Sequence, residues 1–281
     1  MSGVGSNGEE NVTVGMSTAC FYNRLYNEQA LEEMGRMGIR DAEVFFSARM
    51  EYEEPFVVLC KDICDTYGIT VHAVHALPIQ FEPQLFSRHG RQFEEALGIY
   101  RTVLRAGQIL GAKNYVFHGA THLKIARKLT LDMAFAGERA SLLADCAAEY
   151  GIALCYENVH WCWYNIPGFA RALCAHAKSD NLYFTLDMKQ AAQSGHDLFD
   201  YIDDMGGRLR HIHVCDYEIS AEAGVVPRMP FRGQADWRRL RQKLREVNYG
   251  GALMLEVYSN NYGTYDELME TYNEARQFFA D

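Results

Sequence analysis

Short apolar runs alternate with longer amphipathic segments along nearly the whole chain. The apolar runs have the length of buried strands, and strands are predicted over 14–20, 39–46, 69–76, 114–118, 152–157, 181–187, 209–215 and 252–256. The segments that follow them carry apolar residues at helical spacing, which predicts helices over 27–37, 54–67, 85–110, 129–150, 168–177, 198–205, 236–247 and 265–279. Eight strand–helix units in this order indicate an α/β protein with a parallel sheet, which closes most naturally into a (β/α)8 TIM barrel.

The residues between these elements favour one continuous domain. Four predicted helices end at a glycine directly before the next strand, where glycine supplies a left-handed cap. Residues 1–12 are rich in Gly, Ser, Asn and Glu and are expected to form a flexible leader, with 13–281 as a single barrel domain. The longest irregular stretches, 77–84 and 217–235, follow strands, so we expect them to be loops on the active face of the barrel.

The composition of the chain disfavours nucleic acids and membranes as binding partners. A net charge of −10 would repel phosphate backbones, so nucleic-acid binding is disfavoured. No apolar run approaches the roughly 18 residues of a membrane span, and the first residues lack the apolar core of a signal peptide. The eight cysteines contain no Cys-x-x-Cys pair and are expected to be reduced. We therefore expect a cytoplasmic protein with neither a nucleic-acid nor a membrane partner; homo-oligomerisation is left open.

Ionisable residues stand at the carboxyl ends of the last four predicted strands. They are Glu157, Asp187, His213 and Glu256. In a parallel barrel these ends share one mouth, and three carboxylates close together cannot all stay ionised without a cation. Oxygen-rich ligation with one histidine suits a divalent metal, with Mn²⁺ as the first choice and Mg²⁺, Co²⁺ or Zn²⁺ as alternatives.

The same strand ends carry short motifs in a recognisable order. They are Tyr-Glu-Asn (156–158), Thr-Leu-Asp (185–187), His-Ile-His-Val-Cys-Asp (211–216) and Leu-Glu-Val (255–257). In this order the chain resembles the xylose-isomerase-like barrel superfamily, which includes tagatose and psicose 3-epimerases, hydroxypyruvate isomerase, inosose dehydratase and endonuclease IV. The superfamily's Pro-Gly-x-Gly-x-x-Asp-Trp loop survives in part, as Pro-Phe-Arg-Gly-Gln-Ala-Asp-Trp (230–237).

The resemblance implies a metal held by Glu157, Asp187, His213 and Glu256, with Glu157 and Glu256 also acting as an acid/base pair. The implied activity is that of a sugar isomerase or epimerase acting on a ketose, keto-polyol or related carbohydrate. One glutamate would remove the proton next to the carbonyl and the other would return it, while the metal stabilises the enediolate between the two steps. A metal-dependent lyase of the inosose dehydratase type is the alternative, followed by an endonuclease IV-like phosphodiesterase and a non-catalytic barrel.

The chain departs from the superfamily pattern in two places. Gln190 stands three residues after Asp187, where the epimerases and the nuclease carry a histidine. An amide can hydrogen-bond a sugar hydroxyl, so Gln190 remains a substrate-binding candidate, although it is a poor metal ligand. The stretch 217–237 contains no histidine, whereas the nuclease needs one there for its third zinc. A trinuclear zinc cluster is therefore disfavoured.

Five further residues are candidates for binding substrate. His75 and His118 match positions that hold an additional zinc in the nuclease; substrate hydrogen bonding is the preferred interpretation, and a second metal is left open. Lys189 adds a cation beside Asp187, either for an anionic group of the substrate or for solvent. Arg228 loosely matches an arginine that contacts substrate in the epimerases. Trp161 offers an aromatic face to the C–H groups of a sugar, or packs in a lid.

Overall fold

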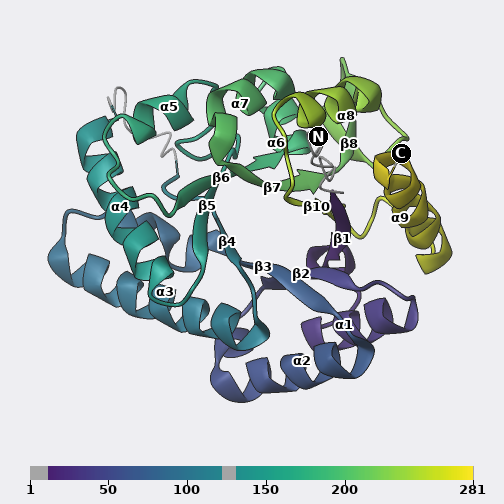
Figure 1. Ribbon diagram of the computed structural model, residues 1–281, viewed down its shortest axis with the longest axis horizontal. Helices are drawn as coiled ribbons and strands as arrows, with labels where there is room; N and C mark the ends of the chain where they lie inside the picture. The colour runs from purple at the N-terminus through teal and green to yellow at the C-terminus, as the bar shows by residue number, and fades with distance from the viewer. Residues whose placement is uncertain (1–11, 122–130, 281) are drawn as a thin grey trace, which may run out of the picture.

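A closed barrel of parallel strands forms the centre of the molecule. The computed structural model describes residues 12–121 and 131–280, and its strands follow the order β1-β10-β7-β6-β5-β4-β3-β2 around the barrel (Figure 1). They are β1 (Thr13–Ser17), β2 (Asp41–Phe46), β3 (Thr70–Ala76), β4 (Asn114–Phe117), β5 (Ala153–Glu157), β6 (Leu182–Asp187), β7 (Leu209–Val214) and β10 (Ala252–Leu255). The predicted (β/α)8 TIM barrel is confirmed. The predicted leader lies outside the described residues.

Helices surround the barrel in Figure 1. They are α1 (Asn27–Arg36), α2 (Glu54–Tyr67), α3 (Gly90–Leu110), α4 (Met133–Ala148), α5 (Phe169–Cys174), α6 (Met188–Gln193), α7 (Leu198–Met205), α8 (Trp237–Glu246) and α9 (Tyr265–Ala280). Several of them are shorter than predicted, and local features mark the start of α4 and of α5. The side chain of Asp132 accepts a hydrogen bond from Phe135 N and so caps the start of α4. Gly168, at φ 96°, places the chain in a left-handed conformation directly before α5.

The stretches expected to be irregular contain ordered elements. Between β7 and α8 the chain forms an antiparallel hairpin of β8 (Asp216–Ser220) and β9 (Gly224–Arg228). Between β3 and α3 it forms the 3-10 turns η3 (Pro78–Gln80) and η4 (Glu82–Phe86). The prediction that 77–84 and 217–235 are irregular was therefore wrong, although both stretches follow barrel strands as expected. Two short strands close in sequence can pair locally through a tight turn, and this pairing leaves little trace in hydrophobic periodicity.

The hairpin is fastened to the barrel by one buried carboxylate. Asp216 is fully buried, and its oxygens accept hydrogen bonds from Gly233 N at 3.0 Å, Ala235 N at 3.0 Å and Trp237 Nε1 at 2.9 Å. We expect Asp216→Ala to lower the free energy of unfolding by about 3 kcal/mol, because buried donors would lose a charged acceptor. Urea denaturation measures the change. The control, Glu218→Gln, removes an exposed ion pair and should cost less than about 1 kcal/mol; equal effects would contradict the anchoring role.

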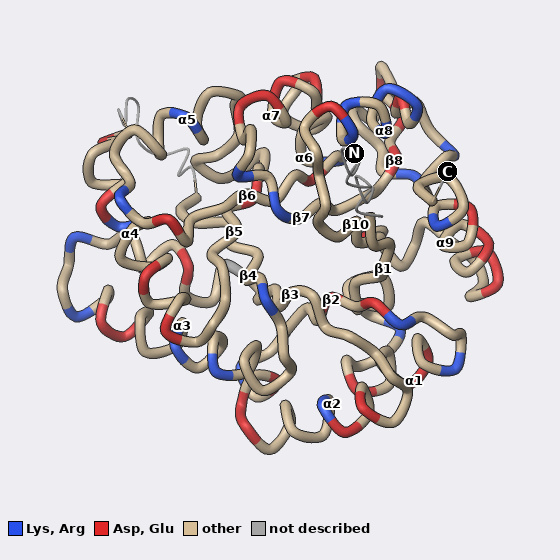
Figure 2. The backbone as a smooth tube through the Cα atoms, in the orientation of Figure 1, with Lys and Arg blue, Asp and Glu red and all other residues tan. Residues whose placement is uncertain are grey.

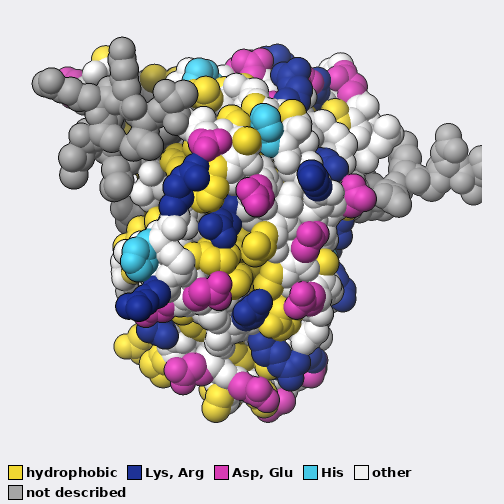
Figure 3. All heavy atoms as spheres, turned by 90° about the vertical axis from the view of Figure 1, so that its left-hand side faces the viewer, with side chains coloured by type: hydrophobic (Ala, Val, Ile, Leu, Met, Phe, Trp, Pro, Cys, Tyr) yellow, Lys and Arg dark blue, Asp and Glu magenta, His cyan; other side chains and the backbone are white. Residues whose placement is uncertain are grey.

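Lys, Arg, Asp and Glu residues lie mainly on the outer helices and loops (Figure 2). On the face that carries α3 and α4, acidic, basic and hydrophobic side chains are interspersed (Figure 3). Within the described part of the chain, no helix combines the length and the apolar composition needed to cross a bilayer.

Candidate functional site

The four strand-end residues predicted as metal ligands come together at the mouth of the barrel. Glu157 ends β5, Asp187 ends β6, His213 lies on β7 and Glu256 follows β10. These four strands are consecutive neighbours around the barrel. One potential ligand atom from each residue lies within 4.8 Å of the others. The neighbouring strands therefore bring three carboxylates and one imidazole to a single point, and their role as metal ligands stays a prediction.

His213 is oriented by contacts on both ring nitrogens. Its Nδ1 atom lies 2.9 Å from Glu157 Oε1 and 3.5 Å from Glu256 Oε2. Its Nε2 atom lies 2.9 Å from Glu43 Oε2. An ionised carboxylate only accepts hydrogen bonds, so Glu43 holds a proton on Nε2 and directs Nδ1 toward the three carboxylates. This is the arrangement in which a second carboxylate orients a metal-binding histidine.

Glu43 is a buried anion on the predicted strand 39–46, and it was not among the predicted site residues. It lies on β2 with no exposed surface, and it accepts hydrogen bonds from Ser17 Oγ at 3.0 Å and His211 Nε2 at 2.8 Å. Burial opposes its ionisation, but the nearby charge of His213 and the hydrogen bond from His211 outweigh burial and hold the pKa of Glu43 well below its usual range. The sequence feature that could have identified Glu43 is a glutamate inside an otherwise apolar strand, because a buried carboxylate needs a partner.

The pKa values of two carboxyl groups of the site shift in opposite directions. Burial disfavours the charged form of Glu157, yet the charges of His213 and His118 lower its pKa to about 2. For Asp187, burial together with the nearby charges of Glu157 and Glu256 outweighs the attraction of Lys189 and raises the pKa to about 6. The charged form of Asp187 is thus disfavoured, first by burial and then by the neighbouring carboxylates.

The two predicted mouth histidines also join the site. His75 Nε2 and His118 Nε2 are 3.0 Å apart, and His118 Nε2 lies 3.1 Å from Glu157 Oε2. His75 Nδ1 lies 3.5 Å from Glu256 Oε1. The ring of Trp161 stacks on His118, with 6.1 Å between the ring centroids and 19° between the planes. The structure therefore places both histidines beside the carboxylates and Trp161 against His118. Their contact with substrate stays a prediction.

The site contains buried polar atoms that lack a hydrogen-bond partner. Within residues 12–121 and 131–280, Glu157 Oε2, His75 Nδ1 and His118 Nδ1 are buried with no partner. An unpaired buried acceptor or donor is costly, so a cation or a polar ligand at this point would stabilise the fold. Together with the oxygen-rich donor set, these atoms fit a divalent metal and a hydroxylated substrate.

The remaining predicted site residues take different places. Lys189 points inward: its side chain is buried, and its Nζ atom lies 2.5 Å from both Asp187 Oδ2 and Glu256 Oε2. The side chain of Gln190 accepts a hydrogen bond from His160 N at 3.1 Å, which joins the segment after β5 to α6. Arg228 lies on the exposed hairpin and pairs with Glu218 at 2.9 Å.

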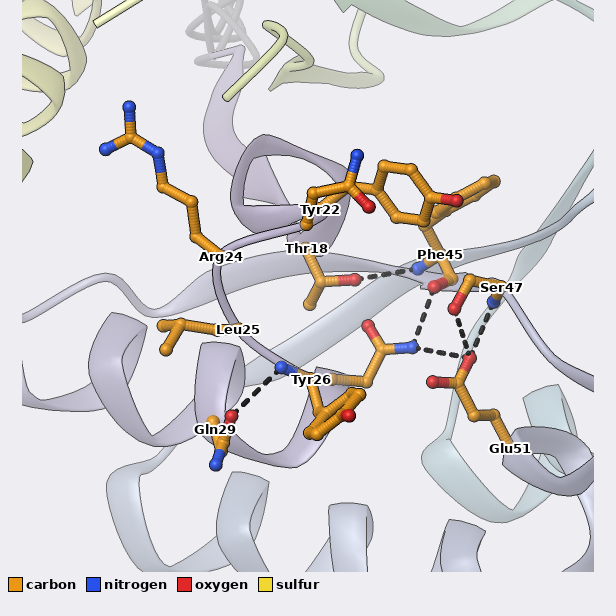
Figure 4. A pocket seen from close by; sticks show the side chains of 11 residues that line it. Thr18, Tyr22, Arg24, Leu25, Tyr26, Gln29, Phe45, Ser47 and Glu51 are labelled. Carbon is orange, nitrogen blue, oxygen red and sulfur yellow. Dashed lines mark hydrogen bonds between the residues drawn. The ribbon is translucent and has the colours of Figure 1, made fainter. Parts of the chain in front are cut away.

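A side pocket of about 400 Å³ opens beside the ends of β1 and β2 (Figure 4). Phe45 connects it to the carboxylate site, because its ring lies edge-on to the ring of His75 with 5.0 Å between centroids. Tyr22 packs against the other side of Phe45 at 6.0 Å. Its volume lies within the range of small-molecule sites. Phe45 is the lining residue that also contacts His75, and none of the four strand-end residues lines the pocket. The hydrophobic pattern of the chain does not indicate this pocket.

A protein family and a curated protein are similar to this chain in sequence. The family model described as xylose isomerase-like TIM barrel matches residues 30–281. An uncharacterised protein of Mycobacterium leprae (strain TN) is 28% identical over 100 residues. That match spans 35% of this chain and 35% of the relative, so the chain matches about a third of the curated relative's length.

Several solved structures share the fold over nearly their whole length. A D-allulose 3-epimerase from Methylomonas sp. in complex with D-allulose has a TM-score of 0.77 and 16% identity, covering 95% of this chain and 96% of its own. A D-psicose 3-epimerase with D-tagatose from Clostridium cellulolyticum H10 has a TM-score of 0.74 and 17% identity, covering 95% and 96%. The 3-keto-D-glucoside 4-epimerase from E. coli has a TM-score of 0.73 and 15% identity, covering 95% and 99%. At these identities the likeness shows the fold.

Proposed function

Because the chain belongs to the xylose isomerase-like TIM barrel family, we propose that it is a divalent-metal-dependent sugar isomerase or epimerase acting on a ketose, keto-polyol or related carbohydrate. The observation that carries the proposal is the convergence of Glu157 and Glu256 with Asp187 and His213, with ligand atoms within 4.8 Å of one another. Three proteins of similar fold, two sugar 3-epimerases and a sugar 4-epimerase, support the same class of reaction.

The metal would be held by Glu157, Asp187, His213 and Glu256. Three carboxylates and one imidazole favour a hard or borderline divalent ion, and Mn²⁺ is our first choice. When bound, the ion would supply Lewis-acid polarisation of the substrate carbonyl.

The two glutamates carry the proton transfer. One of Glu157 and Glu256 removes the proton from the carbon next to the carbonyl, and the electron pair of that C–H bond moves into an enediolate. The other glutamate, which must hold a proton at this stage, donates it to the opposite face of the same carbon, which gives an epimer. Donation to the former carbonyl carbon, with transfer of the hydroxyl proton of the first carbon to the former carbonyl oxygen, gives an isomer. The strands β6 and β7 lie between β5 and β10 in the barrel. The two carboxylates therefore approach a substrate from two sides.

The neighbouring side chains position the substrate in this proposal. The imidazoles of His75 and His118, whose Nε2 atoms lie 3.0 Å apart beside Glu157, would hydrogen-bond hydroxyl groups. Trp161, stacked on His118, would pack against the C–H face of the sugar.

Elemental analysis of the purified protein tests the metal requirement. After reconstitution with Mn²⁺ we expect about one equivalent per chain, because the other two possible donor groups each share residues with the proposed set of Glu157, Asp187, His213 and Glu256. The double variant Glu157→Ala, Asp187→Ala should lose it, and the exposed pair Glu94→Ala, Glu95→Ala on α3 should retain it. A screen of ketoses and keto-polyols then separates the reactions, because an epimer keeps the mass of the substrate and a dehydration product loses water. No bound metal in the wild type would overturn the proposal.

A further inference from the structure

A lysine occupies the centre of the carboxylate site. Lys189 lies in the first turn of α6, two residues after Asp187, and its exposed fraction is 3%. Its ammonium group contacts Asp187 Oδ2 and Glu256 Oε2, each at 2.5 Å. A long cationic side chain stays buried only when opposite charges hold it, so the two carboxylates fix Lys189 inside the site.

The oxygens that contact Lys189 are those that a metal would need. Glu256 Oε2 and Asp187 Oδ2 lie 3.5 Å and 3.9 Å from His213 Nδ1, the imidazole atom directed into the site. The other oxygen of Asp187, Oδ1, is engaged in capping α6, where it accepts a hydrogen bond from Gln190 N at 2.8 Å. Asp187 therefore has one oxygen free for a cation, and Lys189 already contacts it.

We propose that Lys189 is a built-in cation that takes the place of the divalent ion in the metal-free site and competes with it for Asp187 and Glu256. An ammonium group and a divalent ion repel each other strongly at contact distances in a buried site, so loading requires the ammonium to leave these two oxygens. The inference rests on the proposed function, because it concerns the same metal. In this proposal Lys189 sets both the affinity of the site for its ion and the rate at which the ion binds.

The structure also provides a position for the displaced ammonium. The Nζ atom lies 5.6 Å from the centroid of the Tyr258 ring, which belongs to the segment after β10 and is 47% exposed. An aromatic ring attracts a cation to its face. Rotation of the Lys189 side chain toward Tyr258 would carry the charge from the carboxylates to the mouth of the barrel, while α6 stays in place.

Calorimetric titration of the metal-free protein with Mn²⁺ tests the competition. We expect Lys189→Met to bind Mn²⁺ at least tenfold more tightly than the wild type, because methionine fills similar volume and removes the competing charge. The matched control is Lys243→Met on α8, which removes a lysine that pairs with Asp203 at 2.6 Å, on the outside of the barrel. It should bind Mn²⁺ as the wild type does.

Thermal unfolding gives a second readout that does not depend on turnover. Without metal, Lys189→Met should melt below the wild type, because the crowded carboxylates lose their buried cation. With saturating Mn²⁺ its Tm should rise by more than that of the wild type, since a ligand that binds only the folded state stabilises it in proportion to the logarithm of its affinity. Lys189→Gln removes the charge but keeps a hydrogen-bond donor, and its Tm and Mn²⁺ affinity should change in the same direction as those of Lys189→Met. It replaces the methionine variant in both measurements if that variant does not fold.

The outcomes separate this inference from the proposed function. Equal Mn²⁺ affinity in the wild type and the Lys189 variants, or weaker binding in the variants, would overturn the competition and leave the metal-dependent function standing. Binding by the variants alone would support the competition and overturn metal dependence in the wild type. No binding by any of the proteins would overturn both.

Discussion

Replacement of Glu157 by glutamine is expected to lower turnover of the accepted sugar by about 10³-fold or more, because general acid–base catalysis by one positioned group contributes roughly 10²–10⁴-fold. The amide has nearly the shape of the carboxylate but cannot take up the substrate proton. It also replaces a charged ligand of the proposed metal by a neutral one. Steady-state kinetics with the sugar identified in the screen gives the size of the loss, and solvent-proton exchange at the reacting carbon reports the proton-transfer step directly.

Glu256→Gln should show a loss of similar size, because both glutamates are needed to remove and return the proton. The matched control is Glu95→Gln, an exposed glutamate on α3, which should keep wild-type turnover. Circular dichroism and Mn²⁺ content should be measured for each variant, so that a loss of metal is distinguished from a loss of the base. Wild-type turnover in either Glu157→Gln or Glu256→Gln would exclude the two-glutamate mechanism.

Replacement of Glu43 by alanine is expected to have the largest effect on stability. Removing one partner of a buried charge pair costs about 3–5 kcal/mol, because the opposite charge is left uncompensated. Here Ser17, His211 and His213 would all lose their acceptor. Urea denaturation, followed by circular dichroism, measures the free energy of unfolding.

The same substitution tests whether Glu43 positions His213 for the metal. Loss of a carboxylate that orients a metal-binding histidine typically weakens metal binding by about 10–100-fold. Glu43→Gln, which keeps the shape and a hydrogen-bonding oxygen, should retain more of both stability and Mn²⁺ affinity. The control on the same strand is Asp41→Asn, whose carboxylate pairs with His72 and is 31% exposed; it should cost less than about 1 kcal/mol. Unchanged Mn²⁺ affinity in Glu43→Ala would contradict the positioning role and show that Glu43 contributes only to stability.

The two buried cation–carboxylate contacts of the site have opposite consequences for metal binding. Glu43 accepts from the far nitrogen of His213 and leaves Nδ1 facing the carboxylates. Lys189 contacts oxygens on the near side, where the ion would lie. The first contact prepares the site for a metal, and the second opposes its entry. Variants of the two residues should therefore shift Mn²⁺ affinity in opposite directions.

The sequence by itself determined the barrel and the four residues at its mouth. Strand and helix periods are local properties of the chain, and eight repeats of the same unit leave few ways to bury the apolar faces. The ends of parallel strands meet at one side, so Glu157, Asp187, His213 and Glu256 could be brought together from their positions alone. The predicted strands recur in the structure with small shifts at their ends.

Only the tertiary structure decided which contacts complete the site. Glu43 and His213 are 170 residues apart, and nothing in either neighbourhood indicates that one orients the other. Lys189 could have pointed to solvent or to substrate; the start of α6 at Met188 and the capping of that helix by Asp187 direct its ammonium to Asp187 and Glu256. Side-chain direction depends on the local backbone and on charges from distant strands, and these become neighbours only when the barrel closes.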